Sequence, residues 1–401
     1  MKKNLTLRYC VHQFAYWAAS AGIITFATTF LLAKGFPASH VGILLACGSI
    51  LSCLTQPFLA SRADRSEKCI LVPLIIGLTA ISTCCFALLL LDFLPGTLFG
   101  LLYLIGVWSF DAMIPLLNSI SVYYNERGHT INYGLGRGIG SFAYSLAALA
   151  LGYVIKSLGP NWMIFTILVL LPVCILVTLG YPNLAAAARS APSAAQEVPL
   201  QQPCSVGVFF RRYRWYCASL LGVLLLAMFH AMTENYLIAI LGRLGGDSSH
   251  VGVALFIATV VEAPVLFFFS RIRTRISDHW LLRYAAFSFL LKSVLFLAAP
   301  SITSIYIIQL IQTTSYGFLS PVQVYYAEEK VCPADMVKGQ AFITASYTLG
   351  CAMGNFTGGQ LLERFGVVSI LLAGVVIAAL GTLVILLTVE RTDSYRLSAK
   401  L

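Results

Sequence analysis

The sequence predicts an all-α membrane protein with twelve transmembrane helices, arranged as two pseudo-symmetric six-helix bundles. Three observations predict this fold. Apolar runs of roughly 20 residues, the length that crosses a bilayer, recur along almost the whole chain. Positive charge gathers on alternate connections between these runs. Short segments of the first half of the chain return at matching places in the second half.

The composition excludes an ordinary water-soluble domain. Of the 401 residues, 59% are hydrophobic and 10% are charged, whereas soluble domains carry about 25% charged residues. The charged residues lie mainly where the apolar runs break. In chain order, the predicted spans are residues 8–32, 38–61, 69–91, 97–124, 133–157, 161–181, 212–241, 248–271, 279–298, 301–327, 337–362 and 367–387.

One polar stretch, residues 181–204, divides these spans into six and six. It is rich in Ala, Ser and Gln and contains four prolines, a composition typical of a flexible linker. We therefore predict an N-terminal six-helix bundle at 1–181, a cytoplasmic linker at 182–211, a C-terminal six-helix bundle at 212–390 and a cytoplasmic tail at 391–401.

The distribution of Lys and Arg predicts the orientation in the membrane. With the N-terminus in the cytoplasm, nineteen of these residues lie on cytoplasmic segments, and four (Lys34, Lys156, Arg243 and Arg364) lie on the opposite side. The net charge of +10 is therefore a topology signal, and its dispersal over seven segments does not indicate nucleic-acid binding. Residues 1–8 are too short for a signal peptide. We expect a multi-pass protein of the inner or plasma membrane with both termini cytoplasmic.

Three pairs of segments indicate an internal duplication. Each pair occupies the same place in its six-span half, at offsets of 210, 202 and 207 residues. Chance does not explain three such offsets together. The pairs are Ser-His-Val-Gly at 39–42 and 249–252, Val-Tyr-Tyr followed by Asn-Glu or Ala-Glu at 122–126 and 324–328, and the glycines Gly152 and Gly159 against Gly359 and Gly366.

A repeat of six plus six spans around a cytoplasmic loop resembles the layout of the major facilitator superfamily, whose members bind substrate near the midplane between the halves. Residues 60–68, Ala-Ser-Arg-Ala-Asp-Arg-Ser-Glu-Lys, resemble the superfamily's Gly-x-x-x-Asp-Arg-x-Gly-[Arg/Lys] loop. Ala60 and Glu67 replace its two glycines. The resemblance implies a gating loop containing Asp64 and Arg65; the alternative is a solvated cytoplasmic turn.

The fifth span carries a more specific resemblance. Residues 132–141, Asn-Tyr-Gly-Leu-Gly-Arg-Gly-Ile-Gly-Ser, are similar to the fifth helix of lactose permease and of its oligosaccharide, nucleoside and phenylpropionate proton-symporter relatives. This resemblance implies that Arg137 binds substrate and that Tyr144 stacks on a sugar ring. Val-Glu-Ala-Pro at 261–264 and Gln-Leu-Ile-Gln at 309–312 resemble segments of the phenylpropionate-type branch.

The chain also departs from lactose permease. Gln312 and Ser315 stand where that protein has its essential His and Glu in the tenth helix, and Asn118 stands where it has a carboxylate in the fourth. The lactose-type proton relay therefore cannot be transferred to this chain.

Ionisable side chains inside the spans are candidates for proton coupling. A charge at mid-bilayer costs at least ~2.5–3.5 kcal/mol on an insertion scale, so each is expected to be functional. The acids are, in the order in which we expect them to carry the proton, Glu262, Asp111 and Glu234; Lys292 is the base near Glu262. The alternative is simple charge neutralisation, with Glu262 paired to Lys292 and Asp111 to Arg137, and a pair that breaks on substrate binding would serve both roles.

Polar and aromatic side chains complete a predicted cavity lining. Rings and amides suit a polar, ring-shaped solute, although each residue could instead join helices inside the bundle. His12 and His230 have no partner at metal-ligand spacing, so neither a metal nor another cofactor is expected. The predicted lining residues are Gln13, Tyr16, Trp17, Asn118, Tyr144, His230, Asn235, Gln309, Gln312 and Tyr316.

Together these features predict a secondary active transporter. It would import a small polar organic solute, such as a sugar or nucleoside, with protons by alternating access, as a monomer. A proton-coupled efflux antiporter is the nearest alternative, but such exporters usually carry a Gly-Pro-rich fifth helix, and residues 141–153 contain no proline. A siderophore or peptidoglycan-fragment permease is another alternative. An enzyme is not expected, because catalytic motifs and a phosphate loop are missing from the sequence. The sequence leaves the substrate, the stoichiometry and the choice between H⁺ and Na⁺ open.

Overall fold

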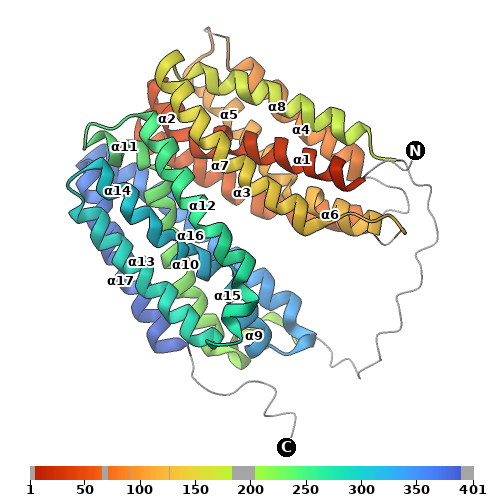
Figure 1. Cartoon of the computed structure of the whole chain (residues 1–401), viewed down its shortest axis with the longest axis vertical. Coiled ribbons are helices and arrows are strands. Elements are labelled where there is room, and N and C mark those ends of the chain that lie inside the picture. The colour runs from red at the N-terminus through yellow and green to blue at the C-terminus, as the bar shows by residue number, and fades with distance from the viewer. Residues whose placement is uncertain (1–4, 66–70, 92, 126, 183–203, 390–401) are drawn as a thin grey trace, which may run out of the picture. The chain divides into compact units, whose positions relative to one another are not determined.

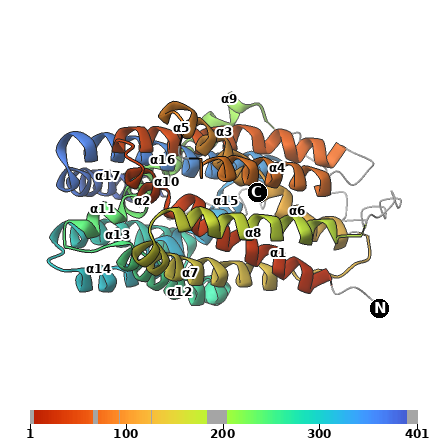
Figure 2. The ribbon, with the colours of Figure 1, turned by 90° about the horizontal axis from the view of Figure 1, so that it is seen from above.

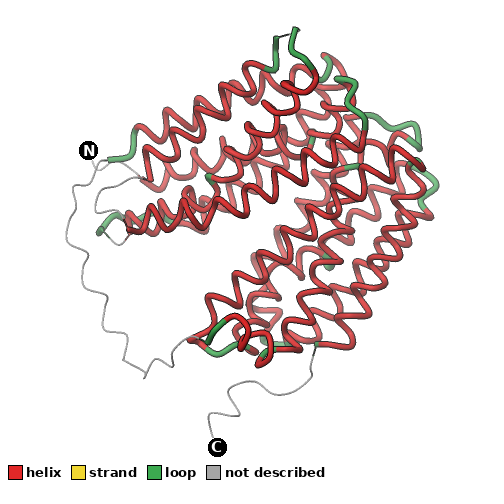
Figure 3. The backbone as a smooth tube through the Cα atoms, turned by 180° about the vertical axis from the view of Figure 1, so that it is seen from behind, coloured by secondary structure: helices red, strands yellow, loops and turns green. Residues whose placement is uncertain are grey.

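The structure, a computed structural model, describes residues 5–65, 71–91, 93–125, 127–182 and 204–389, with the backbone alone at 60–65. In these ranges the chain is helical and has no strand (Figure 3). Nine of the described helices are long and apolar enough to cross a membrane, and one bent pair makes a tenth. The all-α prediction is confirmed, whereas this criterion does not reach twelve spans in the described part of the chain.

Residues 1–196 and 246–256 form the first of two compact units. Its helices α1 to α8 appear in chain order from red to yellow-green in Figure 1, and α12 is green. They are α1 (Leu5–Ser20), the π-helical turn η1 (Ala21–Thr25), α2 (Ala27–Ala33), α3 (Ala38–Arg65), α4 (Leu71–Leu88), α5 (Gly96–Ala112), α6 (Ile114–Asn125), α7 (Tyr133–Leu158), α8 (Asn161–Leu179) and the first part of α12 (Ser248–Arg273).

Helix α1 packs along both α7 and α8, and Figure 2 shows α1 and α8 side by side. Helix α4 packs against α5 and α8, and α3 packs against α5. Glycines let two of these helices approach closely. A Cβ at Gly136 of α7 would lie 2.5 Å from the ring of Tyr9, and one at Gly140 would lie 2.5 Å from Trp17. The glycine-rich start of α7 therefore accommodates the large rings of α1.

Residues 197–245 and 257–401 form the second unit. Helix α10 packs along α16 and α17, and α13 packs along α15 and α17. Besides the rest of α12, the elements are α9 (Val206–Arg212), α10 (Arg214–Asn235), α11 (Leu237–Gly242), α13 (Asp278–Ala298), α14 (Ile302–Gln309), the 3₁₀ turns η2 (Leu310–Thr313) and η3 (Pro333–Asp335), α15 (Tyr316–Lys330), α16 (Met336–Phe365) and α17 (Val367–Thr388).

Four predicted spans are not continuous helices. The first bends by 47° between η1 and α2. The fourth is interrupted by one residue, Met113, between α5 and α6, although Gly96–Asn125 still forms one membrane-length span. The seventh breaks at Tyr236 between α10 and α11, and the tenth at η2 between α14 and α15. These are the first, fourth, seventh and tenth spans, so the breaks follow a three-span period through the duplicated chain.

The duplicated glycines end equivalent helices. Gly159 follows α7 with a φ of 95°, and Gly366 follows α16 with a φ of 77°. Positive φ values of this kind are easily reached only by glycine. At these two places, the repeated glycine therefore ends a helix.

Asp335 joins the start of the second unit to the turn that precedes α16. Its Oδ1 accepts hydrogen bonds from the backbone N–H of Cys204 at 2.9 Å and from Lys338 Nζ at 3.2 Å. Its Oδ2 accepts a hydrogen bond from the Tyr213 hydroxyl at 3.1 Å. Burial raises the pKa of Asp335, but the hydrogen bonds from Cys204, Lys338 and Tyr213 outweigh burial and lower this pKa to about 2.

Candidate functional site

Three of the four broken spans carry predicted site residues at the break itself. Asp111 lies in the last turn of α5, and Glu234 and Asn235 end α10. Gln309 ends α14, and Gln312 belongs to η2. Breaks inside membrane helices leave backbone groups and side chains free to meet ions and substrates, and such breaks are tolerated only away from lipid. The polar residues and the breaks therefore mark the same positions.

In the first unit, Arg137 of α7 lies on the ring of Trp17 of α1. The Arg137 Cζ is 4.0 Å from the ring centroid, which is a close cation–π contact. Arg137 Nη1 is buried and has no hydrogen-bond partner among the described residues. The guanidinium is thus held by an aromatic face while part of its donor set stays unused, as expected of a group that binds an acceptor from outside the protein.

A polar chain extends from Trp17. The Trp17 Nε1 donates to Gln13 Oε1 at 2.9 Å, and Gln13 Nε2 donates to the Tyr9 hydroxyl at 2.7 Å and more weakly to Asn118 Oδ1 at 3.5 Å. Gln13 is fully buried. These contacts fix the orientation of the Gln13 amide and of the Trp17 ring that supports Arg137. The predicted residues Trp17, Asn118 and Arg137 are brought together through Gln13.

The predicted aromatic residues Tyr16 and Tyr144 lie in two further contacts of the same unit. Tyr16 is 1% exposed and stacks on Phe110, with ring centroids 4.3 Å apart. The Tyr144 hydroxyl is 2.7 Å from Thr25 Oγ1, in the π-helical turn η1. In this conformation Tyr16 packs in the core, and Tyr144 ties α7 to the bend of the first span.

Asp111 is half-buried and is not paired with Arg137. Its Oδ1 has no hydrogen-bond partner among the described residues, and the ion pairs found there do not include it. Its backbone carbonyl accepts a hydrogen bond from Gln56 Nε2 at 3.1 Å. The expected pair of Asp111 with Arg137 is thus replaced by two separate half-buried groups, since Arg137 lies on Trp17.

In the second unit, Lys292 of α13 lies in a buried polar cluster. Its Nζ donates to Gln312 Oε1 at 2.7 Å and to Glu234 Oε1 at 3.3 Å. The side chain of Lys292 is 1% exposed and that of Glu234 is 17% exposed. One ammonium therefore joins the break at the end of α10 to the break at η2.

Glu262 of α12 contributes to the electrostatic field at Lys292. Next to it, the carbonyl of Val261 accepts a hydrogen bond from Thr313 Oγ1 of η2 at 3.3 Å. The sequence led us to expect Glu262 as the partner of Lys292, whereas the ammonium donates its hydrogen bonds to Glu234 and Gln312. The reason is that the last turn of α10, which carries Glu234, reaches Lys292.

Other predicted lining residues surround this cluster. His230 stacks on Tyr316, with centroids 4.8 Å apart. Gln309 is fully buried, and both polar atoms of its amide have no hydrogen-bond partner in the described part of the chain. Asn235 Nδ2 donates to Asn355 Oδ1 at 2.6 Å. The unsatisfied amide of Gln309 is costly unless another group meets it, which makes this residue a candidate ligand contact.

Several residues of the two clusters escaped the sequence reasoning. They are Tyr9, the partner of Gln13; Thr25, the partner of Tyr144; and Asn355, the partner of Asn235. Asn355 could have been found, because it is an amide inside the eleventh predicted span, next to Gly354. Nothing in the sequence distinguishes Tyr9 or Thr25 from their neighbours.

The predicted gating residues Asp64 and Arg65 lie outside the residues whose side chains the structure describes. Among the described residues, no three His, Cys, Asp or Glu side chains gather as metal ligands would.

Membrane-length helices that break at buried charges and amides define a polytopic transport protein. The profile of the MFS_1-like family matches residues 6–385. The chain therefore belongs to this family, and it is a major facilitator transporter.

Two curated relatives resemble it along most of their length. It is 26% identical over 371 residues to the uncharacterized transporter YwbF of Bacillus subtilis (strain 168), and the match covers 88% of this chain and 86% of that protein. It is 24% identical over 372 residues to the maltose permease of Geobacillus stearothermophilus, with the same shares covered.

Solved structures share its fold. A mutant of the nucleoside transporter NupG superposes with a TM-score of 0.82 at 14% identity, covering 96% of this chain and 100% of that one. A D-xylose–proton symporter superposes with a TM-score of 0.67 at 14% identity, covering 97% and 98%. At these identities the likeness establishes the fold and leaves the cargo open.

Proposed function

We propose that this transporter is a secondary active symporter that imports a small polar organic solute together with protons by alternating access. A sugar, a nucleoside or a related ring-shaped compound is the favoured cargo. The names of similar proteins support this choice, because they include a maltose permease, a nucleoside transporter and a D-xylose–proton symporter. Its place would be the inner or plasma membrane, as a monomer with both termini in the cytoplasm.

The observation that carries the choice of cargo is Arg137 on Trp17. An arginine supported by an aromatic face presents a flat cation whose unused N–H groups can donate in its own plane. Hydroxyl or carbonyl oxygens of a ring-shaped solute would accept from it. Beside it, the amide of Gln13 fixes the Trp17 ring, and the side chain of Asn118 offers a donor and an acceptor of the kind that recognise such a solute.

The cluster around Lys292 supports the coupling mechanism. When Glu234 is ionised, its charge stabilises the buried ammonium at 3.3 Å. Protonation removes that charge and leaves Lys292 with Gln312, so the link between the ends of α10 and α14 weakens. A proton would in this way change the relative stability of two helix arrangements, which is what coupling requires.

A transport assay in two steps tests the proposal. A thermal-shift screen of the purified protein against sugars, nucleosides and aromatic acids first identifies a binding solute. Proteoliposomes then receive that solute outside, with the lumen either more alkaline than the medium or at equal pH. We expect accumulation only with the pH gradient, and its loss when a protonophore is added.

Three results would each contradict a part of the proposal. Accumulation driven by a Na⁺ gradient at equal pH would show that the coupling ion is Na⁺ and not H⁺. Solute that moves out as protons move in would show that the protein exports its solute. The Arg137→Lys variant should bind the solute weakly, and full binding by this variant would remove Arg137 from the site.

A further inference from the structure

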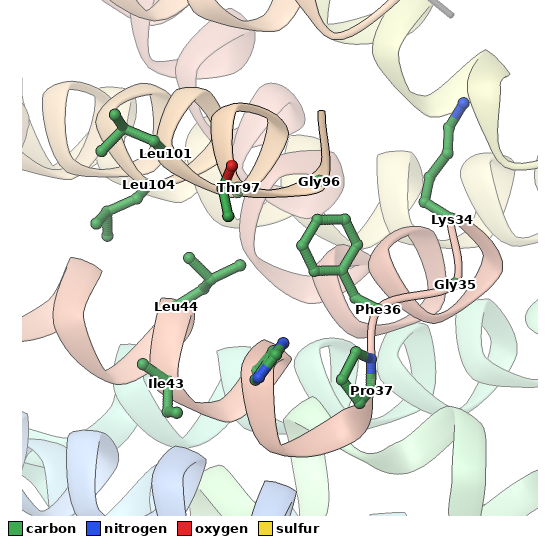
Figure 4. Close-up of a pocket in the computed structure, with 12 residues that line it drawn as sticks. Lys34, Gly35, Phe36, Pro37, Ile43, Leu44, Gly96, Thr97, Leu101 and Leu104 are labelled. Atoms are coloured by element: carbon green, nitrogen blue, oxygen red, sulfur yellow. The ribbon is translucent and has the colours of Figure 1, made fainter. Parts of the chain in front are cut away.

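Away from the polar cluster around Arg137, the first unit contains a pocket of about 590 Å³ at one end of α3 and α5 (Figure 4). Its walls are the connection from α2 to α3, the first turns of α3 and the first turns of α5. It lies at the helix ends that the charge distribution predicts to face away from the cytoplasm.

The floor of the pocket is apolar. Figure 4 shows the ring of Phe36 between α3 and α5, with Leu44 and Leu104 deeper in the space. A Cβ at Gly100 would lie in ordinary contact with the lining, 3.4 Å from Phe36 and 3.6 Å from Leu44, so a larger side chain there would enter the space. From Thr97 to Leu104, α5 advances roughly 10 Å at 1.5 Å per residue. The pocket is therefore a slot between two helices, deep enough for part of a hydrocarbon chain.

The slot is open along part of its length. Ile43 and Leu101 line it and are 39% and 51% exposed, so its open side is apolar as well. A small polar solute would gain little from such walls. A hydrocarbon chain would bury apolar surface against the floor without leaving the bilayer.

The end of the slot next to Lys34 is positively charged. Lys34 lies at this rim, its Nζ 5.9 Å and 6.0 Å from the ring centroids of Phe30 and Phe99, and Figure 4 shows it extending away from the floor. His40 and Thr97 also line the pocket, and none of the described lining residues is acidic. The first amides of α5, a helix of 17 residues, have no side-chain cap and add to the positive potential.

We infer that this slot binds an anionic phospholipid, with one acyl chain between α3 and α5 and the phosphate at Lys34. The charge and the apolar wall lie in the order that a lipid presents, headgroup at the membrane surface and chain below it. A long lysine side chain suits this task, because its flexible stem lets the ammonium follow a mobile headgroup.

Native mass spectrometry of the delipidated protein tests the inference. The purified chain in detergent is titrated with phosphatidylglycerol or with phosphatidylcholine, and bound lipid is counted at each concentration. We expect one phosphatidylglycerol molecule to bind at least fivefold more tightly than phosphatidylcholine. Lys34→Gln should reduce this preference to less than twofold. Gly100→Leu, which fills the slot, should remove the tight site for both lipids.

Matched variants separate the slot from general effects. Arg364→Gln removes an exposed cation at the end of α16, and Gly77→Leu adds the same side chain at an open position of α4; both should bind lipid as the parent does. Equal binding by the parent, Lys34→Gln and Gly100→Leu would overturn the inference. So would competition by inorganic phosphate alone, because the site would then be an anion site. If Gly100→Leu does not fold, Lys34→Gln against Arg364→Gln still decides. Solute transport is not measured, so the result is independent of the proposed function.

Discussion

Lys292 and Glu234 form an ion pair inside the second unit, with 3.3 Å between Nζ and Oε1 and with the lysine side chain 1% exposed. The pair joins α13 to the last turn of α10, next to the break at Tyr236. Removing one partner of a buried pair typically costs about 3–5 kcal/mol, because the other charge is left without compensation. The pair is therefore a sensitive point for both stability and coupling.

Glu234→Gln should abolish accumulation driven by a pH gradient while solute exchange continues. The amide keeps the shape of the protonated acid but cannot release a proton, so uphill transport should fall at least tenfold and counterflow should persist. Uptake and counterflow in proteoliposomes measure the two activities. Glu262→Gln is the matched variant: if it uncouples transport and Glu234→Gln does not, the proton site is Glu262.

The double variant Glu234→Gln with Lys292→Met distinguishes coupling from charge balance. Replacing both partners removes the stranded charge, so the melting temperature lost in Glu234→Gln should largely return. Accumulation should stay absent if Glu234 carries the proton. A double variant that accumulates solute like the parent would make Glu234 a structural partner of Lys292 and would leave Asp111 and Glu262 as candidates.

Arg137→Lys should weaken solute binding at least tenfold with little change in melting temperature. Lysine keeps the charge but loses the planar donor set and much of the contact with Trp17. Titration of the purified protein with the solute found in the screen measures the affinity. Arg127→Lys provides the control, because Arg127 lies equally close to an aromatic ring, 3.6 Å from the centroid of Tyr123, but belongs to neither cluster. Equal affinity of the two variants would remove Arg137 from the binding site.

Asp335→Asn should lower the melting temperature by several degrees at pH 7, and the difference should shrink in acid. The pKa of Asp335 is lowered to about 2 in the folded protein, below the value of about 3.9 for an unfolded chain. Its ionised form therefore stabilises the fold above about pH 4, and this contribution disappears as the pH falls toward 2. Melting curves of parent and variant between pH 7 and pH 3 measure the difference. A difference that does not change with pH would mean that the carboxylate charge is unimportant.

Residue 190 of the linker should be accessible from the cytoplasm alone. In a variant without the native cysteines, Ser190→Cys should react with an impermeant maleimide only in inside-out vesicles. Ser157→Cys, on the exposed last turn of α7, should react only in right-side-out vesicles. The reverse pattern would invert the predicted orientation.

The sequence predicted the helical fold, but it did not predict the helix breaks or the partner of Lys292 in the site. Apolar length and charge bias predicted the helical membrane fold, since burying a backbone in lipid allows few alternatives. The breaks in the first, fourth, seventh and tenth spans were not predicted, because Asp111, Glu234 and Gln312 interrupt hydropathy too briefly to end a run. The carboxylate partner of Lys292 was harder still to predict. Lys292 is 30 residues from Glu262 and 58 from Glu234, and only the packing of α10 against its neighbours decides which carboxylate reaches it.

The last prediction concerns the close approach of α7 to the first turns of α12, within the first unit. A Cβ at Gly152 would lie 2.6 Å from the backbone oxygen of Ser248, and Ser248 Oγ donates to the Gly152 carbonyl at 3.0 Å. Gly152→Ala should therefore force the helices apart and lower the melting temperature, since backbone atoms cannot move aside as a side chain can. Gly138→Ala on the same helix has open space around its Cβ and should not lower it, because alanine favours the helix by about 1 kcal/mol. Melting curves of the two variants decide: if both behave alike, the contact between Gly152 and Ser248 does not stabilise the folded protein.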